Sequence, residues 1–415
     1  MTLGKMQDKN QHHQTIMKTK IDSILGVLMK TVKKLIKTLI CFLLIISLCG
    51  CWNNRELNQL SVVMGIGLDK PEKPYNVEVT AQIVKPSKIA AAGSKGGGGD
   101  GKAYWNIKDK GDCVFGTFRD MVNQSNHKLY FPHNQVIVMG KSLAEDGVSK
   151  YLDFFMRDPE TRLNVLVFVA KGTAGEILDT QPELDKLPAV NMVNVMDAQS
   201  RAVSQTISVK LKDFKARLIS KTTAPVAPYI ELTGEDEPIV TITGTAVFKG
   251  DKMVGLLNKS EGRGLNWVLD EVKSTVIDVK SSQNSIVSME TIRAIGKFSP
   301  EIEGDKIKIE IDILEEGNIG EQTGPEDLSS LSEIEHLKNQ KSEVIKSEVL
   351  AAIKKSKELK ADIFGFGEAV GRKYPVEWRD MEDKWDEIYP KIEVEVNVKT
   401  QVRLMGRISK PAVPE

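Results

Sequence analysis

The residue with the clearest chemical role is a cysteine at the end of a short apolar segment. Residues 39–51 read LICFLLIISLCGC, and four lysines lie between residues 30 and 37. A positively charged stretch, a compact apolar stretch and small residues before a cleavage point are typical of a secretory signal. The last four residues, Leu48-Cys49-Gly50-Cys51, resemble a bacterial lipobox. We therefore predict that residues 1–50, a signal peptide with an extended charged region, are removed and that Cys51 carries lipid.

A second interpretation of the same segment stays open, an uncleaved N-terminal membrane helix. Residues 38–51 would extend about 20 Å as a helix, which is short of the roughly 30 Å of hydrocarbon in a bilayer. Polar residues follow directly after residue 51. Both observations favour a cleaved signal. Met1 and Met29 are both possible starts, and the sequence does not decide between them.

Other patterns that could support chemistry have more ordinary explanations. Residues 96–102 read GGGGDGK, like a phosphate-binding loop, but Ala103 stands where a hydroxyl residue would hold magnesium. His127 and His133 lack a third ligand at a metal-binding spacing. Cys113 has no sign of an electropositive neighbourhood, so we expect a buried or half-buried structural cysteine. The sequence predicts no catalytic residue, no cofactor site and no metal site.

Two stretches near the C-terminus are more distinctive. Residues 362–368 read DIFGFGE, with a glycine on either side of Phe366. Glycine allows backbone conformations that other residues avoid. We interpret this stretch as a tight corner between helices, and a partner-binding role is the alternative. The carboxylates between residues 380 and 386 are expected on a solvated helical face.

Composition limits the class of protein. The chain has 57 basic and 57 acidic residues, so removal of the basic leader leaves an acidic remainder. That balance argues against nucleic-acid binding and against a polybasic membrane patch. About 365 residues after the leader predict two or three domains. We predict an N-terminal α/β domain at 51–234, with a possible break near 181–188 and a flexible glycine-rich loop at 85–102, and a C-terminal α/β domain at 239–407.

Hydrophobic periodicity predicts the elements that build these domains. In the first half we expect strands at 61–69, 77–84, 136–139, 163–170 and 226–232, and helices at 112–125, 147–156, 190–202 and 209–220. In the second half, alternating strands at 239–248, 306–313 and 391–398 indicate an antiparallel sheet with one wet face. A long helix at 331–359 would lie across that sheet. The predicted fold is α/β (mixed α+β) and multi-lobed, with mainly antiparallel sheets.

Two blocks of the sequence carry a family resemblance. The first is residues 51–69, CWNNRELNQLSVVMGIGLD. The second contains DIFGFGE at 362–368, YPVEW at 374–378 and WDEIYP at 385–390, with GKF at 296–298 before it. Together they resemble the Ger(x)C family of spore germination lipoproteins, the C subunits of nutrient germinant receptors in spore-forming Gram-positive bacteria. The resemblance covers essentially the whole chain after residue 50, except the glycine loop.

The resemblance implies a mixed α/β fold of about three lobes and a non-enzymatic protein anchored through lipid, such as palmitate, on Cys51. It implies A-type and B-type receptor subunits as partners and a place on the outer face of the cell membrane or inner spore membrane. A nutrient could bind the complex, but no residue here is assigned to it. A free-standing solute-binding lipoprotein is the alternative function, and an exported cell-wall hydrolase is a weaker one.

Overall fold

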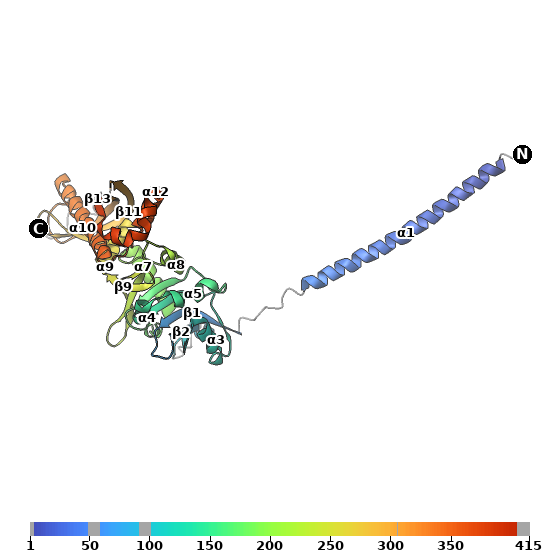
Figure 1. Ribbon diagram of the computed structural model, residues 1–415, viewed down its shortest axis with the longest axis horizontal. Coiled ribbons are helices and arrows are strands. Elements are labelled where there is room, and N and C mark those ends of the chain that lie inside the picture. The colour runs from blue at the N-terminus through green and yellow to red at the C-terminus, as the bar shows by residue number, and fades with distance from the viewer. Residues whose placement is uncertain (1–3, 49–58, 91–100, 305, 405–415) are drawn as a thin grey trace. The chain divides into compact units, whose positions relative to one another are not determined.

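The computed structural model describes residues 4–48, 59–90, 101–304 and 306–404 (Figure 1). It divides into two units, residues 1–59 and residues 60–415. The first unit contains helix α1 (Gly4–Leu48), which is 45 residues long. None of the helices in the described part of the chain combines the length and apolarity that a membrane span requires.

The second unit contains a nine-stranded sheet with parallel strands at its centre. Its strand order is β3-β2-β1-β5-β6-β7-β8-β9, and β4 pairs separately with β1. β1, β5, β6 and β7 pair in parallel, and antiparallel hairpins extend the sheet on both sides. The bounds are β1 (Leu60–Asp69), β2 (Val77–Val84), β3 (Tyr104–Gly111), β4 (Lys128–Tyr130), β5 (Val136–Gly140), β6 (Leu166–Ala170), β7 (Val226–Thr233), β8 (Ile239–Lys249) and β9 (Lys252–Leu257).

Helices cover both faces of this sheet, because its central strands are apolar on both sides. Val136 and Val138 of β5 belong to one apolar cluster with α6 and α7. Ile137 and Met139 of the same strand belong to another, with α5 and α8. The helices of this half are α2 (Pro86–Ala90), α3 (Val114–Asp120), η4 (Met121–Asn123), α4 (Lys141–Asp146), α5 (Ser149–Arg157), α6 (Ala174–Ile177), α7 (Pro188–Ala202) and α8 (Leu211–Ile219).

The second sheet has four strands in the order β10-β11-β12-β13, and the long helix α10 (Leu331–Glu358) packs against it. Leu337, Ile345 and Val349 on one stripe of α10 are fully buried. The remaining elements are α9 (Lys259–Val268), β10 (Thr275–Lys280), β11 (Ile286–Glu303), β12 (Lys306–Gln322), α11 (Phe366–Lys373), α12 (Pro375–Met381), η5 (Glu382–Lys384), α13 (Trp385–Ile388), η6 (Tyr389–Lys391) and β13 (Glu393–Leu404).

The predicted fold class is confirmed. The protein is mixed α+β, six of the eleven pairings between described strands are antiparallel, and the long helix lies on the C-terminal sheet. Every strand predicted in the first half has a counterpart at nearly the same residues. The strands β3, β4, β9, β10 and β11 were not predicted, and β11 alone is 18 residues long.

Two predictions about strand pairing are wrong. The strand at 239–248 does not join the C-terminal sheet, because residues 234–238 form a hairpin turn that returns β8 antiparallel to β7. The strand at 391–398 pairs with β12 in parallel, because α10 to η6 carry the chain back across the sheet before β13 begins. The domain limits at 51–234 and 239–407, the break at 181–188 and the flexible loop at 85–102 stay predictions, and residues 91–100 of that loop lie outside the described residues.

Candidate functional site

Two cysteines were singled out by sequence, and the structure describes one of them. Cys51 lies outside the described residues, so its lipidation stays a prediction. Cys113 is exposed, and the expectation of a buried or half-buried side chain is wrong. It is the N-cap residue of α3, with an extended backbone at φ −149°, and Val114 enters the core in its place.

The DIFGFGE stretch forms a corner built around a buried carboxylate. The Oδ1 atom of Asp362 accepts hydrogen bonds from the backbone N–H groups of residues 364, 365 and 366, at 3.2, 2.9 and 3.1 Å. Its Oδ2 atom accepts from the N–H of Gly367 at 2.8 Å and from the indole Nε1 of Trp385 at 3.1 Å. We call residues 362–368 the Asp362 corner.

The two glycines of the corner are required by its geometry. Gly365 has φ +79°, in the left-handed region that favours glycine, and it is the N-cap residue of α11. Gly367 lies against the indole, and a Cβ atom there would be 2.8 Å from the Nε1 atom of Trp385. The chain can therefore turn sharply around Asp362 while the first N–H groups of α11 stay hydrogen-bonded.

Aromatic rings hold the corner in the core. Phe364 and Phe366 stack with centroids 4.9 Å apart. Phe298, from the GKF stretch on β11, packs edge-on against Phe366 at 5.0 Å. Trp385 and Tyr389, from the WDEIYP stretch, lie with ring centroids 6.0 Å apart on the same cluster. Three stretches of the second sequence block, GKF, DIFGFGE and WDEIYP, therefore meet at one place.

The corner also contacts the first half of the chain. The N–H of Ala224 donates to the backbone oxygen of Asp362 at 2.8 Å, next to an isolated β-bridge between Thr223 and Asp362. The guanidinium of Arg217, on α8, donates to the backbone oxygen of Ile363 at 2.8 Å. Ser220 donates to the carboxylate of Glu368 at 2.7 Å. We call these contacts between residues 217–224 and 362–368 the seam.

Burial sets the electrostatics of the seam. Burial raises the pKa of Asp362 above its ordinary value, while the N–H donors and the indole oppose that rise. Burial lowers the pKa of Arg217, and the nearby carboxylates of Asp362 and Glu368 oppose that fall. Burial also raises the pKa of Tyr389 well above its usual range. The half-buried cation on α8 and the buried carboxylate of the corner therefore attract each other.

This arrangement holds the fold together. Asp362 is only 2% exposed, and five N–H groups of the described residues donate to its carboxylate. A carboxylate in that position cannot reach a substrate from solvent. The interpretation of this stretch as a tight corner is confirmed, and the partner-binding alternative stays a prediction.

The acidic stretch after α12 is exposed and forms ion pairs with the first half of the chain. The carboxylate of Glu382 lies 2.7 Å from the ammonium of Lys221, and Asp386 lies 2.8 Å from Lys249 on β8. Each pair is open to solvent and contributes little by itself. The sequence predicted the solvated face but gave no indication of these partners.

The remaining candidates lie apart from one another. Lys102, the lysine of the glycine-rich stretch, donates to the carboxylate of Asp179 at 2.7 Å. The ring of His133 lies 5.7 Å from that of Tyr130, and His127 contacts Ser125 through its backbone. Within the described residues, no group of three histidine, cysteine or acidic side chains could hold a metal ion.

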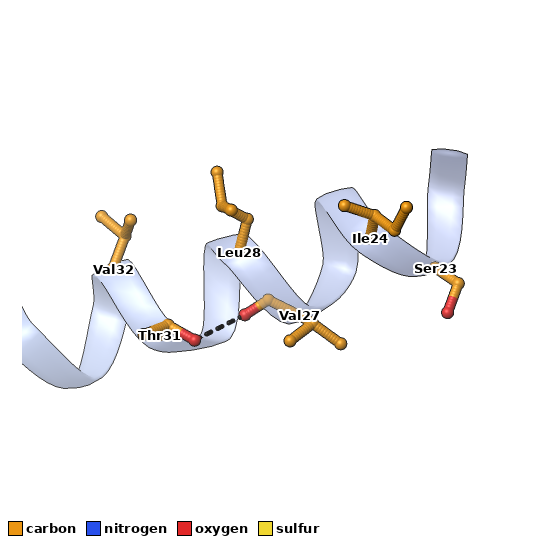
Figure 2. Close-up of a pocket in the computed structure, with 6 residues that line it drawn as sticks. All are labelled: Ser23, Ile24, Val27, Leu28, Thr31 and Val32. Atoms are coloured by element: carbon orange, nitrogen blue, oxygen red, sulfur yellow. Dashed lines mark hydrogen bonds between the residues drawn. The ribbon is translucent and has the colours of Figure 1, made fainter. Parts of the chain in front are cut away.

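Helix α1 carries an exposed apolar stripe. Ile24, Leu28 and Val32 lie on one side of the helix, and the hydroxyl of Thr31 donates to the backbone oxygen of Val27 at 2.9 Å (Figure 2). The stripe begins well before the apolar segment at residue 39. Helix α1 therefore covers most of residues 1–50, and whether this segment is removed stays a prediction.

Comparisons with known proteins match both halves of the chain. The model of the spore germination protein N-terminal domain matches residues 53–232, and that of the spore germination B3/GerAC-like C-terminal domain matches residues 243–406. Spore germination protein KC of Bacillus subtilis (strain 168) is 27% identical over 399 residues, which are 92% of this chain and 98% of that protein. Spore germination protein A3 of the same organism is 28% identical over 379 residues, 89% of this chain and 98% of that protein.

A solved structure has the same fold. The crystal structure of the GerBC protein superposes with a TM-score of 0.52 at 18% identity, and the match covers 84% of this chain and 99% of that one. Because the two domain models together span nearly all of residues 53–406, the chain belongs to the GerAC-like family of spore germination proteins and is a germinant receptor subunit.

Proposed function

We propose that this protein is a lipid-anchored, non-catalytic subunit of a nutrient germinant receptor. The observation that carries the proposal is the family match from residue 53 to residue 406, which begins two residues after a cysteine in a lipobox-like sequence. Acyl chains on Cys51 would hold the folded domains on the outer face of the cell membrane or inner spore membrane, since each buried methylene contributes about 0.8 kcal/mol.

The anchor would promote assembly with the other receptor subunits. A body confined beside the A-type and B-type receptor subunits meets them at a high effective concentration, so weak contacts are enough for assembly. A non-catalytic role is supported by the Asp362 corner, where the most distinctive residues hold the two halves of the fold together. The solute-binding alternative would function without those partner subunits.

The lipid anchor is tested by replacing Cys51 in spores that depend on this chain. We expect Cys51→Ala to lose incorporation of a palmitate analogue, to leave the membrane fraction and to abolish the germination response. Cys41→Ala is the matched control, because it removes a thiol from the same leader, and it should behave as wild type. Full germination by a soluble, unlipidated Cys51→Ala protein would overturn the proposal.

Assembly needs its own experiment. We expect an affinity-tagged chain to copurify with A-type and B-type subunits from detergent-solubilised spore membranes. Their absence from the purified material, together with saturable nutrient binding by this chain alone, would favour the solute-binding lipoprotein instead.

A further inference from the structure

A surface pocket lies at the carboxyl ends of the central parallel strands. Its volume is about 550 Å³. Lys141 is the first residue after β5, and Lys171 is the first residue after β6. Gly140 and Ala170, the last residues of those strands, are register partners, so the two lysines leave the sheet side by side. In open α/β sheets, ligands bind in the crevice outside the carboxyl ends of the strands.

A tyrosine side chain lines the pocket. Tyr229, on β7, is only 5% exposed, and its hydroxyl makes no hydrogen bond within the described part of the chain. The pairing of β7 with β8 is irregular between Tyr229 and Ile230, and such irregularities re-aim side chains beside binding sites. A phenol hydroxyl in a pocket that has no hydrogen-bond partner in the described protein can donate to a bound acceptor.

The cations of the pocket are only partly neutralised. Lys171 pairs with Glu231 at 2.6 Å, but Lys141 approaches Glu145 no closer than 3.7 Å. Lys355, which reaches the pocket from α10, lies 4.0 Å from its acidic neighbour Glu358.

The second acid of the pocket is already engaged. The carboxylate of Glu261 accepts from the N–H of Asn258 at 2.8 Å, in the capping box of α9. Apolar side chains of Leu256 and Leu257 complete the lining. Two of the three lysines have only long contacts with carboxylates, which leaves them able to bind an anionic group, and the apolar wall suits an organic anion.

We propose that this pocket binds a small organic anion carrying a carboxylate or phosphate group. Lys141, Lys171 and Lys355 would surround the anionic group, and the hydroxyl of Tyr229 would donate a hydrogen bond to it. The site draws on β5, β6 and β7 of the large sheet and on α10 of the C-terminal half. It does not depend on lipidation of Cys51.

The proposal is tested by calorimetric titration of the full chain, purified in detergent, with sodium citrate and with inorganic phosphate at constant ionic strength. We expect saturable binding of at least one probe with one site per chain, and the stronger probe identifies the preferred anionic group. Tyr229→Phe removes only the hydroxyl, and Lys355→Gln removes one charge. Each should weaken binding about tenfold or more, since a hydrogen bond to a charged group is lost.

The matched control is Lys354→Gln, an exposed position beside Lys355 on the same helix and outside the pocket. Its affinity should stay within about twofold of wild type, since a surface charge outside the site has little effect. Thermal unfolding of each variant verifies that it is folded. The absence of saturable heat with both probes would overturn the proposal. So would an equal loss in Lys354→Gln, which would indicate general attraction of anions to surface lysines.

Discussion

Replacing Asp362 by asparagine tests whether the corner is held by its carboxylate. Asparagine keeps one oxygen, which can accept the three N–H groups that now point at Oδ1. Its amide nitrogen would take the place of Oδ2, where Gly367 and Trp385 both donate. Two buried donors would then face a third donor and lose their acceptor.

The expected cost follows from those two donors. A buried donor that loses its partner costs about 1–3 kcal/mol, so the loss of two should lower the free energy of unfolding by about 2–6 kcal/mol. Burial raises the pKa of Asp362, so loss of the charge returns part of that cost, and the lower half of the range is expected. A whole domain is stable by about 5–15 kcal/mol, so the change is large enough to measure.

Urea unfolding of the full chain at pH 7, followed by far-ultraviolet circular dichroism, measures the effect. Trp385→Phe and the double variant complete a cycle, and we expect coupling of about 1 kcal/mol or more because the residues share a hydrogen bond. Asp158→Asn is the control, because that half-buried carboxylate accepts one backbone N–H, from Glu160 at 2.7 Å.

The order of the two variants is predicted, as well as the size of the loss in unfolding free energy. Asp362→Asn must destabilise clearly more than Asp158→Asn. A loss below about 0.5 kcal/mol, the size of an ordinary surface substitution, would refute the idea that the five donors depend on this carboxylate.

Three further substitutions probe the same packing by urea unfolding. Gly365→Ala should cost about 1–2 kcal/mol from its left-handed backbone, and an unchanged midpoint would contradict that geometry. Gly367→Ala should cost more than Gly365→Ala, because its Cβ would press on Trp385; the reverse order would refute the contact. Lys341→Met should cost about 3–5 kcal/mol because it leaves Glu315 buried without its partner, and adding Glu315→Gln should restore much of the loss.

The spacing of apolar residues along the chain was enough to predict the strands and helices that bury one regular face. The strand at 77–84 and the long helix near 331–359 were found because apolar residues recur on one face. Strand partners were harder, since alternation in β8 shows that one face is buried but not which sheet buries it. The sequence of residues 234–238 is compatible with a domain junction and with a hairpin turn. The pairing of β7 with β8 shows that it is a hairpin turn.

The buried pair of Lys341 and Glu315 shows where residue type misleads. Lys341 lies four residues after Leu337 and four before Ile345, so helical spacing places it on the buried stripe. A charged side chain is ordinarily expected at the surface. The side chains of Lys341 and Glu315 are nevertheless fully buried, with 2.7 Å between Nζ and Oε1. The periodicity was a usable signal, but the partner on β12 was not visible in sequence.

The seam changes how the most distinctive sequence block is understood. A family motif rich in glycine and aromatic residues invites a search for a binding surface, but Asp362 and its donors are buried. Their contacts reach Arg217 and Ala224, so the motif joins α8 and the segment that precedes β7 to the elements of the C-terminal half. A germination defect in an Asp362 variant would therefore be explained by weaker contacts between the two halves of the fold, unless the variant's free energy of unfolding is unchanged. Stability must be measured first, and only a stable variant can reveal a role in contacting partners.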